Sequence, residues 1–185
     1  MKLAIPFVLF ALCFVPVSHG QKKPAANSSL KEIVTWMENF TDAHGYHTTD
    51  SGIVRHAVFH PVKECTVSLV TDYSDPNGVE KGMPPDALIP ERDNMTVSLS
   101  DLAPNAVRVE TSVSVDKSHR VSEVYFERSD AASLIDTKTK LKSGEIDEYE
   151  LSRGYLYLDS ADSAERLSRA LVRAINLCGG KPAPF

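Results

Sequence analysis

The chain has 185 residues, a formal net charge of −5 at pH 7 and 42% hydrophobic residues. This length suits one domain with a substantial buried core. The negative balance excludes a general attraction to nucleic acid or to anionic membrane surfaces, so we expect no nucleic-acid partner.

The segment 1–20 has the organisation of a secretory signal peptide. Lys2 provides a positive start, an apolar run follows from Leu3 to Val15, and Ser18 and Gly20 place small residues at the cleavage-defining positions. The run is shorter than the roughly twenty residues that a membrane-spanning helix needs. We therefore expect cleavage before residue 21, no membrane span in the mature chain, and a secreted or periplasmic location.

After cleavage we expect a flexible leader over 21–28, a single α+β domain over 29–180 and a flexible tail over 181–185. Ser29 and Glu32 have the spacing of a capping box, and a helix follows that ends near Gly45. Its apolar positions recur every three or four residues, as in an amphipathic helix. They are Leu30, Ile33, Val34, Met37 and Phe40.

Between residues 52 and 158 the apolar period changes to two, which is typical of half-buried strands. Short turn sequences such as Ser143-Gly144 separate the strands, and no helix intervenes. Parallel pairing would need long crossovers, so this order predicts an antiparallel meander. The expected strands are 53–60, 65–69, 95–99, 107–115, 121–127, 133–142, 147–152 and 155–158.

A second amphipathic helix starts at Ser160 or Asp162 and stops at Gly179-Gly180. Its last apolar position is Cys178, and Cys65 lies on the inward side of its expected strand. If the helix packs across the sheet, both sulfurs point into one interface. We therefore expect a Cys65–Cys178 disulfide, with two separate buried thiols as the alternative.

These elements predict a curved antiparallel sheet or a small barrel with an N-terminal helix and a C-terminal capping helix. The order resembles a pleckstrin-homology-type barrel. The sequences Cys65-Thr-Val-Ser-Leu69, Leu99-Ser-Asp-Leu102 and Ala174-Ile-Asn-Leu-Cys-Gly-Gly180 resemble a group of uncharacterised exported bacterial proteins. The resemblance implies architecture and no activity. A lipocalin-like barrel is the alternative, but the Gly-x-Trp expected near its first strand is missing.

Histidines are the first candidates for chemistry. His44 and His47, with Asp50, could supply metal ligands after the first helix. His56 and His60 face the same way on a strand, but about 13 Å separates them, which is too far for one ion. Surface or hydrogen-bonded histidines are the simpler interpretation, so we expect no metal and no cofactor.

Oxygen ligands cluster around Gly78, but the register does not match an EF-hand, and Asp75-Pro76-Asn77-Gly78 is first of all a tight turn. An acidic run could contain a catalytic carboxylate pair, although a solvated edge explains it more simply. The calcium-like residues are Asp72, Asp75, Asn77, Gly78 and Glu80, and the acidic run is Glu145, Asp147, Glu148 and Glu150.

Lys138, Lys140 and Lys142 alternate along one expected strand and could form an anion-binding site. The alternative is that lysines on an exposed strand prevent edge-to-edge aggregation. The segment 74–93 is longer than a typical connection and is the first candidate for a contact surface. Sequons begin at Asn27, Asn39 and Asn94 and matter only in a eukaryotic secretory pathway.

No sequence motif for nucleophilic catalysis is present, since Gly-x-Ser-x-Gly does not occur. We therefore expect an exported, non-enzymatic domain that binds an unknown protein or small ligand. A small extracellular hydrolase or metal-dependent enzyme is one alternative. A ligand-carrying barrel with an apolar interior is the other.

Overall fold

The computed structural model describes residues 24–25, 27–49, 52–74, 90–113, 120–130 and 135–184. The expected signal peptide lies outside these residues. Two carbonyls of the leader, those of Ala25 and Ser28, accept hydrogen bonds from the Arg173 guanidinium. No helix within the described ranges is long and apolar enough to cross a membrane.

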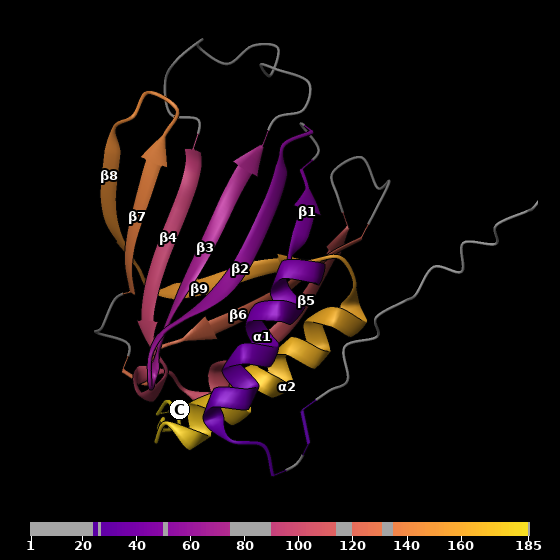
Figure 1. Ribbon diagram of the computed structural model, residues 1–185, viewed down its shortest axis with the longest axis vertical. Helices are drawn as coiled ribbons and strands as arrows, with labels where there is room; N and C mark the ends of the chain where they lie inside the picture. Colours follow the sequence, from indigo (N-terminus) through magenta and orange to yellow (C-terminus); the bar gives the residue numbers. More distant parts are fainter. Residues whose placement is uncertain are drawn as a thin grey trace, which may run out of the picture.

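Helix α1 (Leu30–His44) begins with the expected capping box, in which Ser29 and Glu32 bond to each other's backbone N–H groups. The helix lies along one edge of the larger sheet (Figure 1). There the Gly45 carbonyl accepts from the Ala57 N–H at 2.8 Å, and the Thr41 hydroxyl accepts from the Phe59 N–H at 2.9 Å. Helix α1 therefore satisfies backbone donors that an open edge would leave unpaired.

The larger sheet has six antiparallel strands in the order β1-β2-β3-β4-β7-β8. Strand β8 forms the edge remote from α1, and five of its six residues are exposed. The strands are β1 (Tyr46–Thr48), β2 (Val54–Lys63), β3 (Thr66–Ser74), β4 (Pro90–Ser98), β7 (Ile135–Leu141) and β8 (Ile146–Leu151).

The smaller sheet contains β5 (Arg108–Val113), β6 (Arg120–Glu127) and β9 (Arg153–Leu158) in the order β5-β6-β9. Its strands run across those of the larger sheet (Figure 1). Two short 3-10 turns, η1 (Leu99–Asp101) and η2 (Pro104–Ala106), lie between β4 and β5. They redirect the chain from one sheet to the other, so the expected single meander is wrong at this point.

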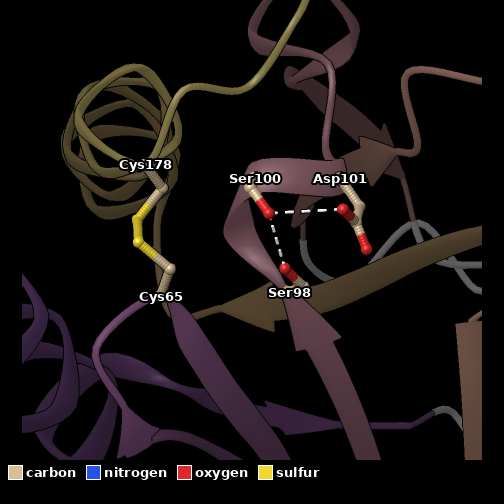
Figure 2. Close-up of a disulfide and its surroundings, with 5 residues drawn as sticks. All are labelled: Cys65, Ser98, Ser100, Asp101 and Cys178. Carbon is tan, nitrogen blue, oxygen red and sulfur yellow. Dashed lines mark hydrogen bonds between the residues drawn. A yellow bond between two sulfur atoms is a disulfide. The ribbon is translucent and has the colours of Figure 1, made fainter.

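Helix α2 (Ala161–Leu177) packs against the smaller sheet and against α1. Its buried face joins a core that also contains Phe59 of β2 and Phe126 of β6, whose ring centroids lie 6.2 Å apart. At the end of α2 the sulfurs of Cys178 and Cys65 lie at disulfide distance, with Cα atoms 5.8 Å apart (Figure 2). The C-terminal helix thus closes the core, and its last turn is tied to the start of β3.

The α+β class with two flanking helices and antiparallel sheets is confirmed. Of the two sheet forms expected, the open one is present, because the described strands form two separate sheets that do not close into a barrel. Strand β1 was missed by the period-two pattern because it has only three residues. Strand β4 begins at Pro90, earlier than expected, so residues 90–93 belong to a strand and not to a loop.

Candidate functional site

Five of the six tyrosines of the chain lie close together where the smaller sheet crosses the larger one. Three belong to the smaller sheet, line one pocket of about 320 Å³ and share it with Glu123 and Arg153. Two belong to β3 and β8 of the larger sheet. We call this region the tyrosine cleft; it comprises Arg55, Tyr73, Tyr125, Tyr149, Tyr155 and Tyr157.

Strand geometry places these side chains. Successive residues of a strand point to opposite faces, so Arg153, Tyr155 and Tyr157 of β9 share one face, while Gly154 and Leu156 face the core. The pairing of β9 with β6 sets Tyr155 opposite Tyr125 and Tyr157 opposite Glu123. The side chains that the smaller sheet contributes to the tyrosine cleft therefore lie on its outer face.

On the wall formed by the larger sheet, the Tyr73 hydroxyl donates to Oδ2 of Asp93. The Thr139 hydroxyl donates to Oδ1 of the same carboxylate at 2.5 Å and lies 3.1 Å from the Tyr149 hydroxyl. Burial, reinforced by the hydrogen bond to Asp93, raises the pKa of Tyr73 far above its ordinary value. Both oxygens of Asp93 are thus held by hydroxyl donors from neighbouring strands.

On the other wall, the Tyr125 hydroxyl donates to Glu123. This bond, with burial as the second cause, raises the pKa of Tyr125 above its ordinary range. Burial likewise raises the pKa of Tyr157, against an opposing effect of Arg55. Tyr73, Tyr125 and Tyr157 therefore stay neutral near pH 7, where they donate hydrogen bonds and offer ring faces and do not act as phenolate bases.

Arg55 of β2 connects the two walls. Its guanidinium carbon lies 5.6 Å from the centroid of the Tyr73 ring and 5.2 Å from that of the Tyr157 ring. Both distances fall within the range of a cation–π contact. His47 of β1 also packs against Tyr157, with ring centroids 4.7 Å apart and the two planes tilted by 31°.

The candidate histidines lie apart from the tyrosine cleft, except His47. His44 bonds to Asp159 at 2.7 Å and His60 to Glu38 at 2.9 Å, while Nε2 of His56 lies 3.1 Å from the Asp42 carbonyl oxygen. These contacts attach α1 to the sheet and to the start of α2. Asp50 falls outside the described residues. No group of three or more metal-ligating side chains occurs in the parts of the chain that the structure describes.

Two of the three lysines proposed as an anion site have carboxylate partners in the structure. Lys138 pairs with Glu148 at 2.6 Å and Lys140 with Glu91 at 2.8 Å, and Lys142 follows the end of the strand. Their strand, β7, lies between β4 and β8, so the expectation of an edge strand is wrong. A pocket of about 480 Å³ adjoins this region, and its charged groups include the Lys138–Glu148 pair itself.

The acidic run forms the exposed edge strand β8 and the turn before it. Of the calcium-like residues, Asp72 pairs with Arg92 at 2.5 Å, and the other four lie outside the described residues. The contact segment expected over 74–93 begins at Ser74, the last residue of β3 and the neighbour of Tyr73, and rejoins the sheet at Pro90 of β4. Both described ends of that segment therefore adjoin the wall of the tyrosine cleft.

A small hydroxyl cluster lies beside the disulfide (Figure 2). The Ser100 hydroxyl is 2.8 Å from that of Ser98 and 3.2 Å from Oδ1 of Asp101, whose other oxygen lies 3.2 Å from Arg128. The Asp101 carboxylate is therefore already paired with Arg128. This cluster has the composition of a structural turn, not of a hydroxyl nucleophile with its base.

The tyrosine cleft was not identified from the sequence. The alternation of Tyr155 and Tyr157 was the one local signal, because it places two rings on one face of a strand. Tyr73, Tyr125 and Tyr149 come from three other strands, and only sheet pairing brings them together. No family model matches this chain, and neither curated proteins nor solved structures show a significant match to it.

Proposed function

We propose that the chain is an exported, non-enzymatic binding domain whose tyrosine cleft holds a small ligand. The observation that supports this proposal is the gathering of five tyrosines where the sheets cross, three of which, Tyr125, Tyr155 and Tyr157, line an open pocket of about 320 Å³. Pockets of this size hold small molecules, and binding sites combine ring faces with a few placed polar groups. Tyrosine supplies both at a low cost in side-chain entropy.

The two cysteines support an exported location. A disulfide persists in oxidising compartments and is rare in the cytosol, so the Cys65–Cys178 pair indicates a non-cytosolic protein. Together with the expected signal peptide, it supports secretion or a periplasmic location.

The test is tyrosine NMR of the full chain with ¹³C-labelled rings. Four ring compounds are titrated: 4-hydroxybenzoate, 4-hydroxybenzamide, D-glucuronate and D-glucose. We expect at least one of them to shift the signals of the cleft tyrosines and to leave Tyr46 unchanged, because Tyr46 is outside the cleft and stacks on His56.

The variant Tyr155→Ala should abolish these shifts, and the matched control Tyr46→Ala should retain them. Both rings are substantially exposed, 39% for Tyr155 and 45% for Tyr46, so neither variant removes core packing. If none of the four compounds moves a cleft tyrosine, or if the shifts persist in Tyr155→Ala, the proposed function is wrong.

A further inference from the structure

Arg55 is a charged group of the tyrosine cleft that has no ion-pair partner among the described residues. Within the described ranges no carboxylate oxygen lies within 4.0 Å of its guanidinium, whereas Arg92, Arg108 and Arg128 each pair with a carboxylate. Arg55 is only half-buried, between two rings that contribute no negative group. The Arg55 guanidinium is thus held at the site by ring contacts and has no carboxylate counter-ion within the described residues.

Its hydrogen bonding is also incomplete. Nε of Arg55 is buried and has no hydrogen-bond partner among the described residues. A buried donor without a partner is costly, so this arrangement is unfavourable for the protein without a ligand. The Arg55 side chain also hydrogen-bonds to Tyr157. Its planar guanidinium carries further N–H donors, and such a fork matches the two oxygens of one oxyanion.

The surrounding carboxylates favour an anion with a single negative charge over a doubly charged one. The cleft contains two carboxylates, Asp93 and Glu123, which accept from Tyr73 and Tyr125, and a second arginine, Arg153, whose guanidinium carbon lies 5.8 Å from the Tyr125 centroid. Arg153, like Arg55, has no ion-pair partner among the described residues. A doubly charged phosphate would meet repulsion from the two fixed carboxylates, and a carboxylate would meet half as much.

The rest of the ligand would contact the exposed rings. Tyr157 lines the pocket and also contacts the Arg55 guanidinium through its ring. Arg55 is therefore next to a residue of the pocket wall. Tyr155 packs edge-on to Tyr157, with centroids 5.6 Å apart at 76°, and remains 39% exposed. A flat or chair-shaped ring can stack on such a face while its acid group reaches Arg55.

From these contacts we infer that Arg55 anchors the carboxylate of a small ring-containing monocarboxylic acid, either an aromatic acid or an acidic sugar. This inference rests on the proposed function, because it names the class of ligand for the same cleft.

The experiment measures dissociation constants for the full chain by isothermal titration with two matched pairs of probes. They are 4-hydroxybenzoate against 4-hydroxybenzamide and D-glucuronate against D-glucose, with inorganic phosphate as a separate anion. The benzoate pair reports an aromatic acid and the glucuronate pair an acidic sugar. We expect the acid of one pair to bind at least tenfold more tightly than its neutral analogue, and phosphate to bind more weakly than that acid.

Arg55→Gln should weaken binding of the acid at least tenfold and leave binding of the neutral analogue unchanged. Arg55→Lys keeps the positive charge but not the planar guanidinium, so it should cause an intermediate loss of affinity for the acid. This variant also provides a test if Arg55→Gln does not fold. Arg92→Gln is the matched control, since Arg92 occupies an exposed position paired with Asp72. It should bind as the unmodified chain does.

Equal binding of acid and neutral analogue, or full binding of the acid by a folded Arg55 variant, would overturn the role of Arg55 while leaving the cleft as a binding site. Tighter binding of phosphate than of either acid would overturn the choice of a carboxylate. Failure of the proposed function looks different, because then neither member of a pair shifts the cleft tyrosines.

Discussion

Gly154 shows how closely β9 approaches the core at a single residue. A Cβ atom at this position would lie 2.2 Å from two ring carbons of Phe126 and 2.8 Å from Sδ of Met95. Such distances are far inside van der Waals contact, and Phe126 is fully buried, so its ring has little room to move. The absence of a side chain therefore lets Tyr155 and Arg153 stand on the outer face while the backbone lies on the core.

We predict that Gly154→Ala destabilises the protein by about 1–3 kcal/mol, the usual cost of overpacking a core. Urea unfolding followed by circular dichroism measures it. Gly144→Ala is the comparison, because a Cβ there meets nothing within 4 Å and the only penalty is the positive φ of 86°. Equal stability of Gly154→Ala and the unmodified chain would show that β9 does not lie this close to Phe126.

At the scale of elements, α1 is attached to the rest of the molecule by polar contacts as well as by its apolar face. Its last residue, His44, accepts a backbone hydrogen bond from Asp159 at 2.9 Å and bonds to the Asp159 side chain at 2.7 Å. Asp159 directly precedes Ser160, the N-cap of α2. This pair therefore links the end of one helix to the start of the other.

The Asp159 pair predicts a pH dependence of stability. Burial opposes the charged carboxylate, but hydrogen bonds from His44 and Ser163 outweigh it and lower the pKa of Asp159 below its ordinary value. A lowered folded-state pKa means that the ionised form stabilises the fold above the unfolded pKa of about 3.9, and that this contribution disappears as the pH falls through the folded pKa.

Asp159→Asn should thus lower the free energy of unfolding at pH 7 by about 0.5–1 kcal/mol, as for a partly exposed pair. The difference from the unmodified chain should shrink below about pH 4. Urea titrations between pH 7 and 2.5 measure it, with Asp136→Asn on the exposed face of β7 as the control. A difference that stays constant down to pH 2.5 would contradict the assigned role of the carboxylate.

For the whole molecule, the Cys65–Cys178 disulfide is the longest-range covalent constraint in the described chain. It spans 113 residues of sequence and joins the start of β3 to the C-cap of α2. The loop that it closes contains most strands of both sheets. Cross-linking such a long loop restricts the unfolded chain strongly, which stabilises the folded state by comparison.

We predict that the double variant Cys65→Ala/Cys178→Ala loses about 2–5 kcal/mol of unfolding free energy. Urea unfolding of the oxidised unmodified chain, the same chain with reductant, and the double variant measures this loss. The reduced chain and the double variant should agree with each other. If thiol titration of the unfolded, unreduced chain found two free sulfhydryls, the disulfide itself would be absent.

The sequence by itself determined the elements that depend on local chemistry. The capping box of Ser29 and Glu32 and the apolar spacing along both helices were sufficient because helices form from residues three and four apart. Alternation identified eight of the nine strands, and the position of Cys178 at the end of an apolar stripe indicated its pairing with Cys65.

Only the tertiary structure decided how the strands divide between two sheets and which faces meet. The turns η1 and η2 move the chain out of the first sheet, and β7 returns to pair with β4 across 40 or more residues, a partnership that no local pattern encodes. The tyrosine cleft depends on that division, since Tyr73 and Tyr157 meet Arg55 only where the sheets cross. Alternation tells which residues share a face of one strand, whereas long-range pairing and packing set what that face contacts.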